Sequence, residues 1–194
     1  MKKLLITGFE PFGGEKINPS WEAVKLLPDE IGDFLLKKIE VPVVFEKAAE
    51  TVISATKEFS PDAIICVGQA GGRTGITPEM VAINLRYAKI PDNEGTKPED
   101  EPCIKDGENA IFATLPVRKM TDAISDCGIT AAVSYSAGTY VCNDLIYHVL
   151  EHCKNTETKA CFIHVPFIPE QTSDKPSMAL ESIAKGLEAA IKAI

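Results

Sequence analysis

The sequence predicts an α/β protein, a single domain over residues 1–194 that folds as a three-layer α/β/α sandwich with a mostly parallel, mixed sheet. Three observations predict it. Short apolar runs alternate with helical patterns along the whole chain, as in parallel sheets covered by helices. Residues 63–67 (AIICV) are continuously apolar, which is typical of a strand buried on both faces. No internal repeat or linker divides the 194 residues, a length that suits one core.

The first half of the chain begins with a strand. Asn18 can cap the helix that follows, and Pro19 fits its first position. The next helix is amphipathic, with one face formed by Ala48, Ala49, Val52, Ile53 and Thr56. The predicted elements are strands at 3–7, 35–41 and 63–67, and helices at 19–27 and 45–59.

The second half continues the alternation. Its predicted elements are strands at 79–87, 110–115, 131–135 and 159–165, and helices at 117–126, from about 141 onward, and at 176–194. Gly128 is expected to end the helix at 117–126. Residues 89–109 are rich in Pro, Asp, Glu and Gly and lack periodicity. So long a loop in a compact domain is usually functional, and we expect it to help cover the site.

Composition excludes several classes of function. The formal charge of −8 and the pI near 5.0 argue against a nucleic-acid partner and an anionic membrane partner. The lysines and apolar residues at the N-terminus resemble a signal peptide, but the run is too short and is better read as a strand. No stretch approaches the roughly 20 apolar residues of a membrane helix. Six cysteines without a C-x-x-C pair indicate reduced thiols, and we expect a cytoplasmic protein.

Cys142 occupies the most informative position in the chain. A turn of small residues, SAGT, precedes it, and a helical apolar pattern follows it. The sulfur should therefore lie in the first turn of a helix, where the helix dipole and free N–H groups favour a thiolate and can hold an oxyanion. The alternative is that Cys142 is a buried apolar residue, as free cysteines often are.

A cysteine nucleophile needs a base, and the chain has three histidines. His148 and His152 lie within the helix after Cys142 and should project sideways from it. His164 ends an apolar strand, where α/β sheets gather their ligands, although a lone histidine there is more often a core residue. Glu79 could orient the imidazole, as the third member of a triad, or be an exposed acid at a strand end.

Two other motifs offer alternatives. His148-Val-Leu-Glu-His152 matches the H-x-x-E-H pattern of zinc peptidases, but a third ligand is needed and none is obvious. Residues 8–16 are similar to a phosphate loop, but the lysine does not directly follow Gly13 and no Ser or Thr comes next. A zinc site and a nucleotide site therefore remain weak alternatives.

Together these residues resemble the pyroglutamyl peptidase I family of cysteine exopeptidases over about residues 7–171. The matching motifs are TGFEPFGG, NPSW, VGQAGGR, EMVAIN, IPDNEG, SAGTYVCN and FIHVPFIPEQ. The resemblance implies an α/β/α sandwich, a homotetramer, no metal and no cofactor, and peptides with an N-terminal pyroglutamate as substrates. It implies Cys142 as nucleophile, His164 as general base and then acid, and Glu79 as the orienting carboxylate.

Pyroglutamate is a neutral lactam, which calls for an apolar slot with amide partners. Phe9 and Phe12 could flank the ring, and Gln69 and Asn18 could pair with the lactam C=O and N–H. The rest of the predicted wall is Ile90, Tyr140 and Val141. Ordinary core packing is the alternative for the aromatic residues.

Two departures from the family pattern bear on activity. Met80 stands where the family commonly has Arg, and Tyr87-Ala88-Lys89 where Asp-Ala-Arg is common. Lys89 could replace that arginine only as a point charge, without its bidentate fork, which would reduce activity. A pyroglutamate-binding protein without catalysis is therefore a second hypothesis.

Overall fold

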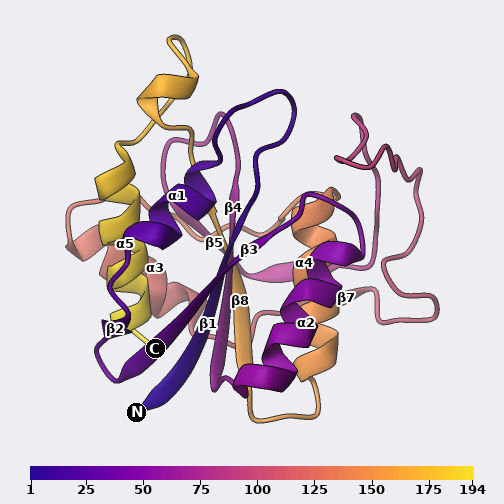
Figure 1. Cartoon of the computed structure of the whole chain (residues 1–194), viewed down its shortest axis with the longest axis horizontal. Coiled ribbons are helices and arrows are strands. Elements are labelled where there is room, and N and C mark those ends of the chain that lie inside the picture. Colours follow the sequence, from indigo (N-terminus) through magenta and orange to yellow (C-terminus); the bar gives the residue numbers. More distant parts are fainter.

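A computed structural model describes residues 1–194 and contains one six-stranded sheet in the order β2-β3-β1-β4-β8-β5 (Figure 1). Strands β3, β1, β4 and β8 are parallel, and the two edge strands β2 and β5 are antiparallel to their neighbours. The strands are β1 (Lys2–Phe9), β2 (Glu30–Ile31), β3 (Phe34–Val41), β4 (Ala63–Gln69), β5 (Thr77–Glu79) and β8 (Lys159–Val165). The mostly parallel, mixed sheet is as predicted.

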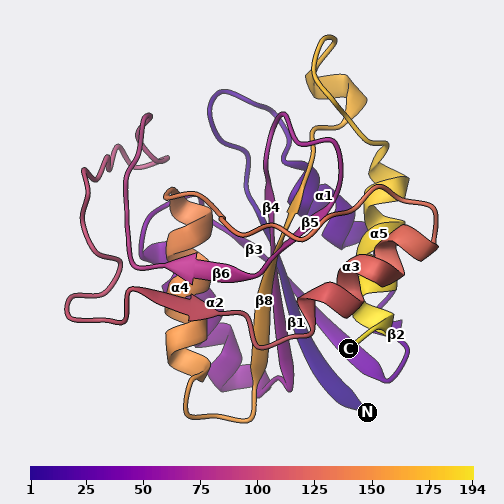
Figure 2. The ribbon, with the colours of Figure 1, turned by 180° about the vertical axis from the view of Figure 1, so that it is seen from behind.

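Helices cover both faces of this sheet (Figures 1 and 2). One face carries α1 (Pro19–Leu26), α3 (Val117–Asp126) and α5 (Leu180–Lys192), and the other carries α2 (Lys47–Phe59) and α4 (Val141–Cys153). Each face has its own hydrophobic core, of 26 buried residues under the first set of helices and 23 under the second. The predicted three-layer sandwich is confirmed.

The strand connections create a crevice at the carboxyl ends of the central strands. From β1 the chain passes through α1 to β3, and then through α2 back across β1 to β4. Connections on opposite sides of β1 separate the loops that follow β1 and β4, and ligands bind at such switch points. Strand β8 adds beside β4, with His164 opposite Gly68. The carboxyl ends of β1, β4 and β8 therefore lie together.

The predicted strand at 131–135 is wrong. Those residues form only isolated bridges, from Ala131 to Ile76 and from Ser134 to Glu79. The predicted strand at 79–87 is also divided. Glu79 ends β5 in the main sheet, and β6 (Val81–Ile83) pairs with β7 (Ala110–Phe112) in a separate two-stranded sheet (Figure 2). The apolar pattern continues through Met80 while the backbone changes its pairing partner, so the sequence does not reveal the break.

Several element ends differ from the predictions. The closing helix begins at Leu180 and not at residue 176, because Ser177 bridges to Phe167. Strand β7 ends at Phe112, three residues before the predicted end. The short strand β2 and the 3₁₀ helix η1 (Pro169–Gln171) had no sequence signal. None of the helices combines the length and apolar character needed to cross a membrane.

Candidate active site

A cavity of about 300 Å³ lies where β1, β4 and β8 end. Its lining is mostly apolar and includes a thiol, an imidazole, a guanidinium and an amide. The lining residues are Phe9, Phe12, Val43, Gln69, Ala70, Arg73, Ser136, Ala137, Gly138, Tyr140, Val141, Cys142 and His164.

His164 and Glu79 form a buried pair at this site. His164 Nδ1 lies 2.7 Å from Glu79 Oε1, and the two residues are 3% and 2% exposed. Strands β8 and β5, which carry them, are hydrogen-bonded neighbours, so the sheet itself sets the distance. Nδ1 is held by the carboxylate, and Nε2 makes no hydrogen bond and is left for another partner.

Cys142 reaches the same cavity from the other direction. It is the second residue of α4, as predicted. Its sulfur lies against Gly68, where a Cβ atom would be 2.9 Å from Sγ and 2.6 Å from Phe162 Cζ. Because Gly68 is paired with His164 in the sheet, the missing side chain leaves room for the sulfur near the imidazole. No hydrogen bond joins the two side chains in this structure.

Burial sets the protonation states of these groups. Burial raises the pKa of the Cys142 thiol to about 12, and the nearby charge of Glu79 adds to this, while Arg73 acts against it. Burial lowers the pKa of His164, although Glu79 opposes that shift. Burial would raise the pKa of Glu79, but the hydrogen bond with His164 and the charge of Arg73 bring it below its ordinary value. At neutral pH the site therefore holds a thiol, a neutral imidazole and a carboxylate.

This result differs from the thiolate expected at a helix N-terminus. The helix N-terminus is present, and the N–H groups of Val141 and Cys142 make no hydrogen bond to another residue, while the Cys142 N–H favours the charged form of its own sulfur and lowers the thiol pKa slightly. The cost of burying a charged sulfur outweighs the contribution of these N–H groups. Those two N–H groups remain available to an oxyanion.

Arg73 belongs to the site and was missed in the sequence. Its Nη1 lies 2.7 Å from Glu79 Oε1 and also contacts Thr77 Oγ1, and its Nη2 donates to Ser136 O at 3.1 Å. Arg73 thus joins the carboxylate to the turn that precedes α4. The available signal was its place directly after the Gly-rich loop at the end of β4, where a charged residue has few structural reasons to occur.

Five of the seven predicted pocket residues line the cavity: Phe9, Phe12, Gln69, Tyr140 and Val141. The rings of Phe12 and Tyr140 are 6.3 Å apart. The amide oxygen of Gln69 accepts a hydrogen bond from Gln171 Nε2 at 3.1 Å, which leaves its NH₂ group free. Val43 and Ala70 complete the wall and carry no sequence signal that distinguishes them from core residues.

Asn18 and Ile90 lie outside the lining. Asn18 caps α1, as predicted, with its oxygen accepting from Ser20 N at 3.1 Å, while its NH₂ group donates to Glu10 O at 3.0 Å. Its amide is thus committed to the fold and holds the loop after β1 in place. Ile90 is 50% exposed on the outer surface.

The long loop supports a wall of the cavity and does not cover it. No residue between 84 and 109 lines the cavity. Instead Pro91 O accepts from Tyr140 OH at 3.0 Å, and Asp92 Oδ2 accepts from Phe45 N at 3.0 Å. Lys89 is exposed and also lies outside the lining. The expectation that this loop covers the site is therefore wrong.

The H-x-x-E-H motif is used for other contacts. His148 Nε2 lies 3.4 Å from Asp144 Oδ1 and 3.3 Å from Arg86 Nη2. The adjacent guanidinium would repel a cation at this nitrogen. No group of three or more His, Cys, Asp or Glu side chains is arranged to hold a metal ion.

Comparison with known proteins gives one consistent family for this chain. Residues 2–194 match the protein family described as pyroglutamyl peptidase. Pyrrolidone-carboxylate peptidases from Streptococcus pyogenes serotype M4 and Staphylococcus carnosus are each 53% identical to this chain, and each match covers 99% of this chain and 92% of the relative. The crystal structure of pyroglutamyl peptidase I from Bacillus amyloliquefaciens superposes with a TM-score of 0.96 at 48% identity, covering 100% of this chain and 96% of that one.

The family match spans nearly the whole chain, and the relatives share half of its residues and its complete fold. The chain therefore belongs to the pyroglutamyl peptidase family.

Proposed function

We propose that this chain is a cysteine exopeptidase that hydrolyses the amide bond after an N-terminal pyroglutamyl residue. One observation carries the proposal: the cavity that holds Cys142 and His164 is mostly apolar and has no carboxylate in its lining. An aminopeptidase for ordinary peptides needs an acid to bind the α-ammonium group. A pyroglutamyl group has no charge at that position, and the apolar lining suits it.

The ring of the substrate would lie between the aromatic side chains. Phe9 and Phe12 lie on the loop side of the cavity, and Tyr140 and Val141 lie at the start of α4. The free NH₂ group of Gln69 can donate to the lactam oxygen. With the ring bound in this way, the scissile carbonyl would lie near the start of α4, next to Cys142.

The reaction begins as Cys142 Sγ attacks the scissile carbonyl carbon and His164 Nε2 takes the thiol proton. The N–H groups of Val141 and Cys142 hold the resulting oxyanion. The imidazolium then protonates the leaving amine, the C–N bond breaks, and a thioester remains. Water attacks the thioester while His164 accepts its proton, and the imidazolium returns that proton to the sulfur as pyroglutamate leaves. Glu79 stabilises the imidazolium in both steps.

The test is the release of chromophore from a pyroglutamyl amide, measured with and without iodoacetamide. We expect turnover that is lost after alkylation and unaffected by a chelator. Cys142→Ala and Cys142→Ser should abolish turnover, with circular dichroism unchanged. A chelator-sensitive, alkylation-resistant activity would indicate a zinc peptidase. Saturable binding of pyroglutamyl peptides without product would indicate the binding-only hypothesis, to which the exposed Lys89 gives some support.

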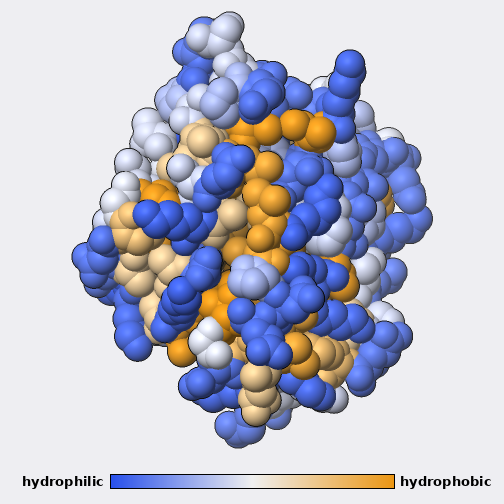
Figure 3. Space-filling view, turned by 60° about the vertical axis from the view of Figure 1, so that its left-hand side comes forward, coloured by the Kyte–Doolittle hydropathy of each residue, from blue (hydrophilic) through white to orange (hydrophobic).

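We also propose that the chain acts in the cytoplasm as a homotetramer. All six cysteines are free thiols, which suits a reducing compartment. Apolar side chains reach the surface in a band between charged ones on the side that carries α1 and α5 (Figure 3), and Leu26 of α1 is 52% exposed. Such surface is a candidate for contact between copies. Sedimentation equilibrium should give four times the chain mass, and a monomer at all concentrations would contradict the assembly.

A further inference from the structure

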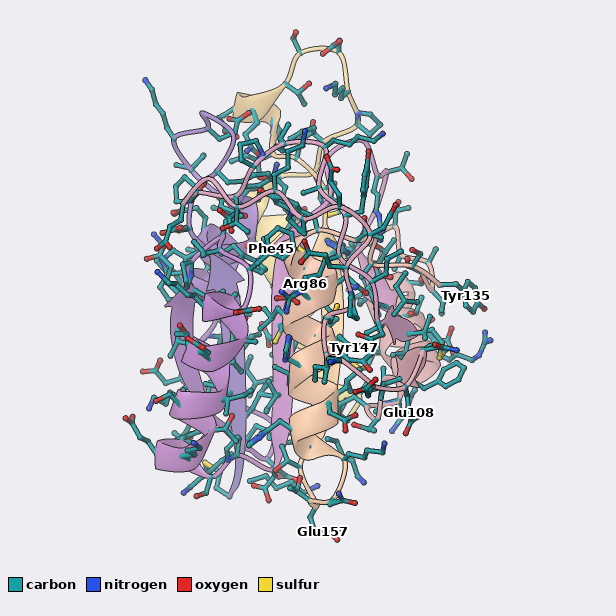
Figure 4. All side chains as sticks on the ribbon, turned by 90° about the vertical axis from the view of Figure 1, so that its right-hand side faces the viewer. Phe45, Arg86, Glu108, Tyr135, Tyr147 and Glu157 are labelled. Carbon is teal, nitrogen blue, oxygen red and sulfur yellow. The ribbon has the colours of Figure 1, made fainter.

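A second buried cluster lies on the side of α4 that faces away from the cavity. Arg86, at its centre, is 8% exposed. Its Nε donates to Asp144 Oδ1 at 2.7 Å, Nη1 to Glu46 Oε1 at 2.7 Å, and Nη2 to Cys103 O at 2.8 Å. Figure 4 shows Arg86 beside the first part of α4, close to Phe45. One guanidinium thus joins the long loop, α4 and the start of α2.

Asp144 belongs to the same helical turn as Cys142. Two helical positions correspond to about 200° of rotation, so the carboxylate and the sulfur point to opposite sides of α4. Asp144 is fully buried, and its Oδ2 accepts from the N–H of Glu46 at 2.9 Å. Between them, Asn143 accepts from Ile83 N at 3.0 Å and donates to Ile83 O at 2.8 Å. The turn that carries Cys142 is therefore held by polar contacts from behind.

Glu46 connects the same cluster to the cavity wall. Its backbone has φ = 63° and ψ = −50°, a strained γ-turn conformation that a glutamate adopts only when its surroundings hold it there. The ring of the preceding residue, Phe45, packs edge-on against Tyr140, with centroids 5.4 Å apart. Val43, two residues earlier, lines the cavity. Contacts to Glu46 therefore fix the path of the segment that forms one wall.

We propose that Arg86 and Asp144 are positioning residues, which set the place of Cys142 through the first turn of α4 and the shape of the pocket through Val43–Glu46. The inference rests on the proposed function. Lysine could not replace Arg86, because a single ammonium group cannot reach partners in the three directions that the planar guanidinium serves. Displacement of a nucleophile by about 1 Å can cost on the order of 100-fold in rate.

The experiment compares Arg86→Lys and Arg86→Met with a matched control, Lys154→Met. Lys154 caps the C-terminal end of α4 and pairs with Glu108 of the same long loop. Glu108 lies toward that end of the helix, away from Arg86 (Figure 4). Both ion pairs join the loop to α4, but only the Arg86 pair lies next to Cys142. For each variant, kcat and KM for a pyroglutamyl amide are measured per titrated thiol, together with the rate of Cys142 alkylation by iodoacetamide and the Tm.

We expect kcat/KM to fall about tenfold in Arg86→Lys and about 100-fold in Arg86→Met, with a changed alkylation rate in both. Lys154→Met should stay within about twofold of the parent on every kinetic measure, since exposed ion pairs contribute little. A lower Tm with unchanged kcat/KM per titrated thiol would show a purely structural cluster and overturn the proposal, as would an equal fall in the control.

A second variant and a measurement without substrate test the proposal where the Arg86 variants or the parent activity fail. If the Arg86 variants do not fold, Glu46→Gln replaces them, because its side chain is 60% exposed and the change keeps a hydrogen-bond acceptor. A raised KM in that variant supports the proposal, and unchanged kinetics overturn it. If the parent protein itself hydrolyses no pyroglutamyl amide, the proposed function has failed. The alkylation rates of Cys142, which need no substrate, then still decide the question of positioning.

Discussion

At the scale of residues, the site holds a thiol and an imidazole that are neutral at neutral pH, as the proposed reaction requires, beside the carboxylate of Glu79. The partly buried thiol of Cys142, with its pKa raised to about 12, cannot act as a preformed thiolate at neutral pH. In the proposed reaction, transfer of the proton to His164 therefore has to accompany attack on the carbonyl. Burial lowers the pKa of His164, which keeps the imidazole in the form that can accept this proton. The negative charge of Glu79 then stabilises the imidazolium that forms when His164 takes this proton.

Arg73 affects all three proposed catalytic groups, and its replacement gives a test. Its positive charge lowers the pKa of both Cys142 and His164. In Arg73→Gln we expect kcat/KM to fall by about 100-fold, because Glu79 loses its ion pair and the thiol becomes a weaker acid. The pKa of His164 should rise, and since activity requires the neutral imidazole, the acid limb of the pH profile should move to higher pH.

Rate profiles between pH 5 and 9 measure this effect. Arg73→Lys should retain more activity than Arg73→Gln, because it keeps the charge but cannot contact Glu79 and Ser136 together. The control is Arg118→Gln, which removes an exposed hydrogen bond to Tyr135 and should leave the profile unchanged. An acid limb that stays in place in Arg73→Gln would contradict the electrostatic role of Arg73.

The sequence identified individual site residues where their chemistry stood out from their surroundings. His164 was a polar residue in an apolar run, and it lines the cavity as expected. Asn18 was recognisable as a cap, but a cap side chain has no hydrogen bonds left for a ligand, so its second predicted role conflicts with its first. The role of Arg73 is harder to infer, because its contact with Ser136, 63 residues away in the sequence, arises only in the folded chain.

At the scale of elements, close approach between backbone segments shapes the site. A Cβ atom on Gly8 of β1 would lie 2.4 Å from the Cα of Trp21 in α1. Helix α1 therefore lies directly on the strand, and Phe9 N, next to Gly8, donates to Ser20 Oγ at 3.0 Å. The strand end that carries Phe9 into the cavity thus depends on this contact between helix and strand.

Gly8→Ala should destabilise this contact. The nearest atoms belong to backbone and cannot turn aside, so the helix has to move, and we expect a loss of about 2–3 kcal/mol in the free energy of unfolding. Urea titration measures it. Gly13→Ala is the comparison, because its Cβ would meet no atom within 4 Å and only the left-handed φ of 63° costs energy, about 1 kcal/mol. Equal losses in the two variants would contradict close packing of α1 on β1.

Elements were predictable where hydrophobic periodicity and local signals agreed. Helix α3 has the predicted bounds, Val117–Asp126, and α4 begins next to Cys142 as expected. Strand β8 also has its predicted bounds, Lys159–Val165. The strand signals at 79–87 and 131–135 failed, because an apolar run records burial and not the identity of the hydrogen-bonding partner. The segment 131–135 is held beside Ile76 and Glu79 by single bridges, and no property of its own residues distinguishes that from a strand.

At the scale of the whole molecule, three buried ionisable groups couple folding to pH. Burial lowers the pKa of His164 below its ordinary value of 6.5, so the unfolded chain binds this proton more readily than the folded one. For Asp144, burial acts against ionisation, but hydrogen bonds with His148 and the backbone of Glu46, together with the charge of Arg86, lower its pKa below 3.8. Glu79 is likewise lowered below 4.5. All three shifts have the same sign, so acid destabilises the fold.

The loss of stability should come in two windows as the pH falls. From about pH 6.5 downward, protonation of the unfolded state at His164 lowers the free energy of unfolding until the lowered pKa of the folded state is passed. From about pH 4.5 downward, Glu79 and Asp144 lower it further. Urea midpoints at constant ionic strength from pH 7.5 to 3.5 measure both windows. The variant His164→Gln should lose the upper decline and keep the lower one. If the midpoints of this variant still fell between pH 6.5 and 5 as steeply as those of the parent, the upper window would have to come from other groups. The evidence that His164 is a neutral, buried imidazole, on which the proposed proton transfer from Cys142 depends, would then be lost.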